Sequence, residues 1–281
     1  MPIVTRRDGG PADGLSSLQR IMPFLMPRRN DAYVLFEQQI DTTAPKRLLA
    51  RLNADRPDDT RVTLFHCVLR ALGIALTEFP RLNRFIVGGR VYDRRGVFLS
   101  FSAKRRLDRD APVFSSKLAF DARESLVAMS ERLHAELRRG RRGETASDRE
   151  IRTLLPLPGP VLRALVWVQR RLDAWNLLPE RLLADDPLYA SAFVANLGSL
   201  GLDAAYHHLF EYGTIPIFIT MGRVHRAPVV HDDGSVGSRE IFVLRYTYDE
   251  RIQDGFYAAR ALERLAEILG DPEQLSGASS G

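Results

Sequence analysis

The residues of this chain best suited to acid–base chemistry lie in a short acidic turn within Arg245–Phe256, RYTYDERIQDGF. A strand-like run ends there in Asp249 and Glu250, Asp254 follows, and Gly255 precedes a helix-forming segment. A carboxylate in such a turn can accept a proton from a bound ligand, or it can pair with an arginine and stabilise the turn. Glu250 is therefore a candidate general base.

Histidines provide the second set of candidates. His207 and His208 stand in AYHHLFEYGT, in the loop before a strand-like run. One of them could act as a base, the pair could bind a ligand, or both could pack and cap the loop. His66 lies in an apolar segment and is expected to be a hydrogen-bonded core residue. No two histidines have zinc-ligand spacing with a convincing third ligand, so no metal site is expected.

Composition sets the class of protein in which these residues must work. With 281 residues, 45% of them hydrophobic and 27% charged, the chain can build a substantial core. The one cysteine, Cys67, excludes an intramolecular disulfide and suits a reducing compartment. No signal-peptide pattern is present, and no run approaches the roughly 18 to 20 apolar residues of a membrane span. A cytoplasmic protein without a transmembrane segment is expected.

The charge balance is basic, with a formal net charge of +5 and a pI near 9.6. Much of the excess stands in ELRRGRRGE, residues 136–144. A nucleic-acid surface normally adds aromatic or groove-reading elements, which this segment lacks. We therefore expect a solvated helix end and no nucleic-acid partner, with the docking of an acidic partner as the alternative.

The first half of the chain alternates strand and helix signals. Residues 1–19 are polar and rich in Gly and Pro, which predicts a flexible lead. A strand is expected over 32–41, a helix over 43–54 with a threonine cap and Pro45 in its first turn, and a buried helix over 62–79 that stops at Pro80. Two strands should flank Gly88-Gly89 as a hairpin, and a third should begin at Val97.

The second half begins with helices and returns to strands. An amphipathic helix is expected over 120–139, and a helical insert broken by prolines over about 140–190. The insert carries apolar residues near helical spacing from Val161 to Trp175, which could pack on the domain or a second subunit, or serve a membrane surface or partner groove. Strands return within 191–199, 215–224 and 240–249, and a final helix should begin near Phe256 and end at Gly270. Residues 276–281 are expected to be a flexible tail after a single domain over 20–275.

Three stretches in this order resemble the catalytic domain of the dihydrolipoamide acyltransferases of 2-oxoacid dehydrogenase complexes. They are VTLFHCVLRALGIALTEFPRLNRF, SAFVANLGSLGLDAAYHHLFEYGTIPIFITMGRV and LRYTYDERIQDGFYAARALERLAEILGDPEQL. The resemblance covers most of 60–105 and 190–275, is weaker over 20–60, and is lost over roughly 140–190. The Asn-Leu-Gly turn, the Asp-x-Arg-x-x-Asp-Gly turn and their separation agree together.

The resemblance implies an α/β two-layer sandwich (α+β) with a mixed β-sheet covered by helices, the chloramphenicol acetyltransferase-like fold of CoA-dependent acyltransferases. It also implies a homotrimer or a higher assembly of trimers. In this family the active site is a channel between subunits, entered by coenzyme A from one end and a lipoyl arm from the other. A histidine in the terminal motif takes the thiol proton, and a serine before the Asn-Leu-Gly turn donates to the oxyanion. These two positions hold Glu250 and Ala195 here.

Two hypotheses follow from these replacements. A free glutamate has a pKa of about 4.3 and a thiol one of about 8.5, so a carboxylate is a poor base for this reaction. Loss of one oxyanion donor removes about 3 to 4 kcal/mol of transition-state stabilisation unless another group substitutes. The first hypothesis is a non-catalytic scaffold or acyl-CoA-binding relative.

The second hypothesis is an acyltransferase of altered chemistry that uses coenzyme A or a phosphopantetheine carrier. Its candidate catalytic residues are Glu250, Asp254, Asn196 and His208, with Glu250 or His208 as base. No covalently bound cofactor is expected, and a dehydrogenase or an acyl carrier is a possible partner. Only about 20 to 30 residues precede the core, so we expect any acyl group to arrive on another carrier.

Overall fold

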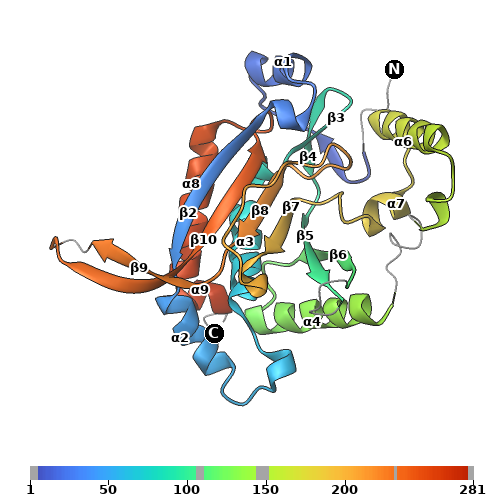
Figure 1. The fold of residues 1–281 in the computed structure, drawn as a ribbon. Coiled ribbons are helices and arrows are strands. Elements are labelled where there is room, and N and C mark those ends of the chain that lie inside the picture. The colour runs from blue at the N-terminus through green and yellow to red at the C-terminus, as the bar shows by residue number, and fades with distance from the viewer. Residues whose placement is uncertain (1–5, 106–110, 144–151, 231–232, 278–281) are drawn as a thin grey trace.

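A mixed seven-stranded sheet forms the centre of the molecule in the computed structural model, which describes residues 6–105, 111–143, 152–230 and 233–277. Its strands lie in the order β2-β10-β8-β7-β5-β6, and β9 pairs with an extension of β10 (Figure 1). The parallel pairs are β5 with β7 and β7 with β8, and the other pairs are antiparallel. The strands are β2 (Tyr33–Asp41), β5 (Val97–Lys104), β6 (Val113–Phe120), β7 (Ala192–Asn196), β8 (Ile217–Met221), β9 (His225–Val230) and β10 (Val236–Asp249).

Helices cover one face of this sheet and enclose the main core between the two layers (Figure 1). They are α2 (Thr43–Leu52), α3 (Leu64–Glu78), α4 (Leu126–Arg142), α8 (Gly255–Gly270) and α9 (Pro272–Ser276). Ten residues of α3 are buried, as its apolar character on all sides predicts. The two-layer α/β fold inferred from the sequence is confirmed.

The segment that contains α3 also meets a simple test for a membrane span. Residues Asp58–Glu78 are long and apolar enough to cross a bilayer, although no such segment was expected from the sequence. The apolar window is 61% buried inside the protein, and α3 contributes Cys67, Val68 and Leu69 to the main core. Burial of this kind is typical of a central helix in a globular domain.

The N-terminal lead contains secondary structure that its composition did not predict. Within it, β1 (Gly9–Pro11) pairs with β4 (Arg90–Arg94), which pairs in turn with β3 (Phe85–Val87). Arg6 is buried, forms ion pairs with Asp8 and Asp173, and stacks near the rings of Phe85 and Tyr92. Residues 6–19 therefore contain a strand and the start of a helix that were not expected from the sequence, while residues 1–5 lie outside the described chain.

The helical insert lies beside the sheet, next to this small second sheet (Figure 1). It contributes α6 (Gly159–Ala174) and α7 (Glu180–Asp185), while residues 144–151 lie outside the described ranges. Helix α1 (Ser17–Leu25) is near the tip of the β3–β4 hairpin. The large apolar residues of α6 are mostly exposed, so they do not pack into the core of this chain.

Most of the expected elements are present, with two corrections. The helix expected over 120–139 begins only at Leu126, because Val113–Phe120 forms the edge strand β6 and Ser125 caps the helix by accepting from the Ala128 amide. The prediction that a threonine side chain caps α2 is also wrong. Thr42 instead donates its hydroxyl to the Glu240 carbonyl, and Asp41 accepts from the Thr43 amide.

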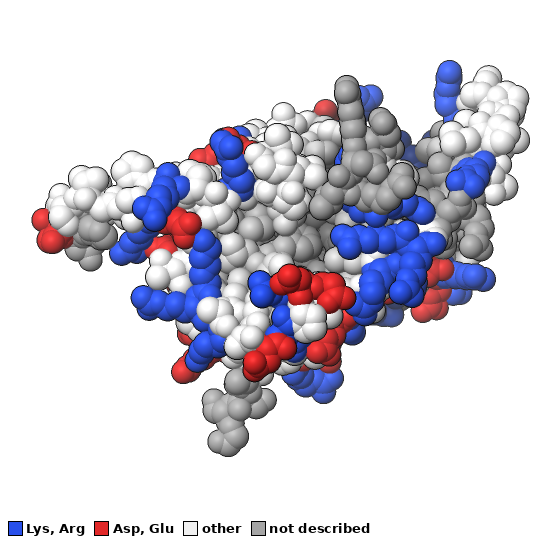
Figure 2. Space-filling model, turned by 60° about the horizontal axis from the view of Figure 1, so that its bottom comes forward, with Lys and Arg blue, Asp and Glu red and all other residues white. Residues whose placement is uncertain are grey.

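The basic segment 136–144 forms the exposed end of α4, apart from residue 144, which lies outside the described chain. Arg139 forms an ion pair there with Glu136 at 2.8 Å, and the Arg139 side chain is largely exposed. Figure 2 shows the lower face of the molecule, where basic and acidic side chains lie next to one another. The segment is therefore a solvated helix end in this chain, as expected.

Candidate functional site

The acidic turn after β10 is held by a buried ion pair between its own residues. Arg251 donates from Nε and Nη2 to the two carboxylate oxygens of Asp249, at 2.7 Å each, and the two side chains are 3% and 1% exposed. The third guanidinium nitrogen, Nη1, donates to the Met26 carbonyl at 2.6 Å. Such a bidentate ion pair fixes both side chains and leaves neither available for catalysis. Asp249 and Arg251 therefore shape the turn.

Glu250 stands between these two residues in the chain and takes no part in their ion pair. Its amide donates to the Ala32 carbonyl at 2.9 Å, which ties the turn to the start of β2. The residue is half-buried, and its carboxylate forms no ion pair or side-chain hydrogen bond within the described residues. Its charge acts on Tyr248, whose pKa is raised to about 12 by burial first and then by Glu250 and the other turn carboxylates.

Asp254 has a structural role at the beginning of α8. Its Oδ1 accepts from the Tyr257 amide at 3.0 Å, and its Oδ2 accepts from Gln253 Nε2 at 2.6 Å. An aspartate at this position satisfies a helix amide and favours the positive end of the helix dipole. The Asp-Gly pair of the motif is thus an N-cap followed by the first helical residue, and Asp254 was not identified as a cap from the sequence.

The Asn-Leu-Gly turn closes the other end of the sheet. Asn196 ends β7, and its Oδ1 accepts from the Ser199 amide at 3.0 Å. The Ser199 hydroxyl donates to the Asn196 carbonyl at 2.8 Å. A Cβ at Gly198 would lie 2.5 Å from the Gly222 carbonyl oxygen, so only glycine allows this close approach. Ala195, at the position of the expected serine, is half-buried and has no side-chain donor.

The two turns do not meet within one chain. Ala195 lies opposite Thr220 in β8, whereas the Asp249 amide donates to the carbonyl of Pro216, just before the same strand. At about 3.3 Å per residue, the turns are about 13 Å apart along the strands, and β7 and β10 are separated by β8. Glu250 and Asn196 could therefore share a site only across two copies of the chain.

The loop before β8 packs its histidines against the second face of the sheet. The His207 ring stacks on Phe218 with centroids 3.9 Å apart, and His208 stacks on His207 at 4.4 Å. The Nδ1 atoms of the two rings donate to the carbonyls of His208 and Leu209. Burial, followed by the charge of His208, lowers the pKa of His207 despite its backbone hydrogen bond.

His208 is exposed, and no hydrogen bond joins it to Glu250 or Asn196 in the described ranges. His66 is the core residue expected from the sequence. Its Nδ1 accepts from the Thr63 amide at 2.9 Å, and burial lowers its pKa to about 3. The described residues contain no group of three or more His, Cys, Asp or Glu side chains placed to hold a metal ion.

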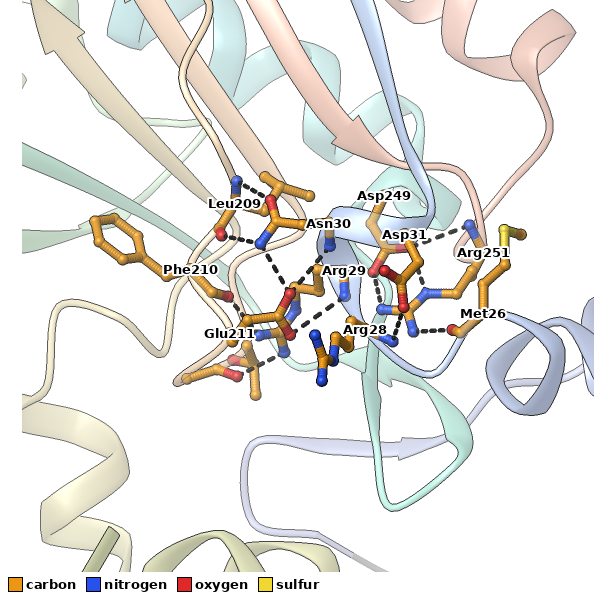
Figure 3. Close-up of polar contacts among 12 residues, drawn as sticks. Met26, Arg28, Arg29, Asn30, Asp31, Leu209, Phe210, Glu211, Asp249 and Arg251 are labelled. Carbon is orange, nitrogen blue, oxygen red and sulfur yellow. Dashed lines mark hydrogen bonds and ion pairs between the residues drawn. The ribbon is translucent and has the colours of Figure 1, made fainter. Parts of the chain in front are cut away.

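A polar network beside the acidic turn was not found from the sequence (Figure 3). Arg29 is buried and donates to the carbonyls of Phe210 and Gly213, while Glu211 accepts from the amides of Arg29 and Asn30. Asn30 also exchanges hydrogen bonds with the backbone of Leu209. These contacts hold the histidine loop against the chain that enters β2. A sequence signal was absent, because the partners are about 180 residues apart.

Comparison with known proteins agrees with this architecture. Residues 180–276 match the family model of the 2-oxoacid dehydrogenases acyltransferase catalytic domain. A probable dihydrolipoamide acetyltransferase from Listeria monocytogenes is 15% identical, with a TM-score of 0.63 over 96% of this chain and 97% of that one. The cubic core of a pyruvate dehydrogenase multienzyme complex gives 16% identity and a TM-score of 0.61 over 98% and 99%.

A chloramphenicol acetyltransferase is also similar in fold, with 12% identity and a TM-score of 0.53 over 96% of this chain and 100% of that chain. The fold likeness extends over nearly the whole chain, whereas the family match is confined to its C-terminal part. The chain thus has the fold of the CoA-dependent acyltransferases, and over residues 180–276 it matches the catalytic domain of the 2-oxoacid dehydrogenase acyltransferases, as its motifs indicated.

Proposed function

We propose that this protein is a non-catalytic, oligomeric relative of the acyltransferases, a scaffold or acyl-CoA-binding subunit that lacks the means to deprotonate a thiol. The observation that carries the proposal is the acidic turn, where a carboxylate replaces the imidazole that the resemblance implies. Asp249 and Arg251 are held by each other, and Arg251 also donates to the Met26 carbonyl. The turn is therefore stable without a catalytic group at its centre.

The second turn supports the same conclusion. Thioester exchange needs a donor for the negative charge that develops on the carbonyl oxygen when a thiolate attacks it. Ala195 offers no donor, and the nearby Ser199 hydroxyl is already bound to the Asn196 carbonyl. The expected loss is about 3 to 4 kcal/mol of transition-state stabilisation, which adds to the missing base.

The positions of the two turns favour an oligomer. Because they lie at opposite ends of the sheet in one chain, a site that uses both needs a second copy. We propose a homotrimer or a larger assembly of trimers in the cytoplasm. Coenzyme A or an acyl-CoA is the proposed ligand of the channel between subunits, and a dehydrogenase or an acyl carrier is the proposed partner.

An active acyltransferase is the second candidate, and two observations favour it. The Glu250 carboxylate is not paired with an arginine in the described chain, so it remains available to a ligand. The Nδ1 proton of His208 is given to the Leu209 carbonyl, which leaves Nε2 of an exposed ring free to accept a proton. In this reaction a thiol proton would pass to the base and the thiolate would attack the thioester carbonyl. The C–S bond of the original thioester would then break, and the departing thiolate would take the proton back from the base.

An assay of thioester exchange by the purified protein distinguishes the non-catalytic relative from the active acyltransferase. Acetyl-CoA and longer acyl-CoAs are mixed with dihydrolipoamide, and release of the free CoA thiol is measured. We expect no turnover by the natural protein, and turnover by a variant that combines Glu250→His with Ala195→Ser. Turnover by the natural protein would overturn the proposal. Loss of that turnover in Glu250→Gln but not in Glu267→Gln would identify Glu250 as the base, since Glu267 is an exposed carboxylate on α8.

A further inference from the structure

A cavity of about 890 Å³ lies between the helical insert and the N-terminal part of the chain. Its walls come from α1, from α6, and from loop residues 211–213, and the tip of the β3–β4 hairpin lies between the two helices. Ligand-binding pockets commonly have volumes of about 300 to 1,000 Å³. Glu250, Asn196 and His208 do not line this cavity, which we call the insert pocket.

The hairpin tip sets the spacing of the two helices. Gly88 and Gly89 both have positive φ, at 57° and 75°, as a tight two-residue turn requires. A Cβ at Gly88 would lie 3.0 Å from the Ala174 carbonyl oxygen at the end of α6. A Cβ at Gly89 would lie 3.1 Å from the ring of Phe24 in α1. The glycines therefore let the turn fit between the helices and form part of the pocket wall.

Both helical walls present large apolar side chains that are largely exposed, although the Arg171 guanidinium lies 5.2 Å from the centre of the Trp167 ring. Phe24 on α1 is 66% exposed, and Val166 and Trp167 on α6 are 47% and 59% exposed. Leu162, Ile86 and Val87 add to the apolar lining. Exposed apolar surface of this kind, concentrated on facing walls, is a feature of binding sites.

The charged lining is unbalanced toward arginine. Both acidic lining residues are occupied, since Asp173 pairs with Arg6 and Glu211 accepts from the amides of Arg29 and Asn30. Arg29 and Arg251 are committed to backbone carbonyls and to Asp249. On α6, by contrast, Arg163 and Arg170 have no ion pair or hydrogen bond among the described residues. They add positive charge to the apolar wall of the pocket.

We propose that the insert pocket binds an amphiphilic anion, an apolar chain that ends in a carboxylate or phosphate. The chain would lie between Phe24 and Trp167, and the head group would pair with Arg163 and Arg170. Guanidinium groups bind both carboxylates and phosphates through paired hydrogen bonds. This site is independent of Glu250, so it holds whether the protein is an enzyme or a scaffold.

The chain contains two tryptophans, Trp167 and Trp175, so fluorescence can report on the pocket directly. In a Trp175→Phe variant, Trp167 is the only reporter. Decanoate, decyl phosphate and decanol are titrated below their aggregation limits. We expect saturable changes in emission with the anions and at least about tenfold weaker binding of decanol. A preference between decanoate and decyl phosphate identifies the head group.

Arg163→Gln with Arg170→Gln, in the same background, should weaken the binding of the anions at least tenfold and leave decanol unchanged. Arg141→Gln with Arg142→Gln is the matched control, because these two arginines lie on the exposed end of α4. Equal binding of decanol and the anions, an equal loss in the control, or no saturable binding would overturn the proposal. The last result, together with a smaller assembly after Val166→Glu, would show that a second copy of the chain covers the pocket instead.

Discussion

The acidic turn and helix α6 both concentrate charge, and they use it in opposite ways. In the turn, Asp249 and Arg251 are buried and form a bidentate ion pair, and the remaining guanidinium nitrogen donates to the Met26 carbonyl. On α6, Arg163 and Arg170 are exposed and unpaired within the described chain. The first arrangement stabilises the fold, whereas the second is available to a ligand. The part of the chain that resembles a catalytic motif is thus the more structural of the two.

Breaking the buried pair gives the largest expected effect. Arg251→Ala leaves the Asp249 carboxylate buried without its partner and removes the donor to the Met26 carbonyl. Removal of one member of a buried pair costs about 3 to 5 kcal/mol of unfolding free energy. Urea unfolding followed by circular dichroism measures this loss.

Arg239→Ala is the control for this prediction, because Arg239 pairs with Asp41 on the surface. An exposed pair contributes less than about 1 kcal/mol. A cost for Arg251→Ala that is as small as the control's would show that the turn does not depend on its internal pair, and the comparison with α6 would lose its basis.

The core histidine gives the next largest effect, through pH. Burial first, and then the charge of the His134 ring 5.0 Å away, lower the pKa of His66 to about 3. The unfolded chain binds this proton below about pH 6.5, whereas the folded protein does not until about pH 3. Stability is therefore full above pH 6.5 and falls as the pH drops toward 3. At pH 4.5 the expected loss is about 2 to 3 kcal/mol relative to pH 7.

Urea unfolding at these two pH values tests the assignment. In His66→Gln the difference between pH 7 and pH 4.5 should shrink by about that amount. His225→Gln, which removes an exposed histidine, should keep the natural difference. An unchanged difference in His66→Gln would assign the acid sensitivity to other groups.

Elements with a strong hydrophobic pattern could be predicted from the sequence, and those without one could not. The buried helix α3 and the Gly88-Gly89 hairpin have local signals and are present as expected. Strand β9 was not predicted because most of its residues are exposed, so its sequence has no alternation of apolar and polar residues. It also contains Pro228, and it is a strand only because it pairs with β10. In β6, Phe114 and Leu118 do face inward at period two, but two serines and Lys117 between them hid the pattern.

The candidate site divides in the same way. The acidic turn that holds Glu250 could be found from residue types, and the resemblance to the acyltransferase motifs added Asp254 and Asn196. Their roles depend on contacts that no local pattern encodes, such as the bond from Arg251 to Met26, 225 residues away. Arg251, the neighbouring arginine with which Glu250 could have paired, pairs with Asp249 instead. Spacing thus locates a turn, but tertiary hydrogen bonds decide which of its residues remain free.

The smallest effect is expected on α6 and completes the comparison. Arg163→Gln with Arg170→Gln removes two charges that have no partner in the described chain, so the free energy of unfolding should change by less than about 0.5 kcal/mol. Urea unfolding of the unliganded variant measures it. A loss above about 1 kcal/mol would mean that the two arginines hold the insert in place. Unchanged stability together with weakened anion binding would show that the charge on α6 serves recognition, in contrast to the charge in the acidic turn.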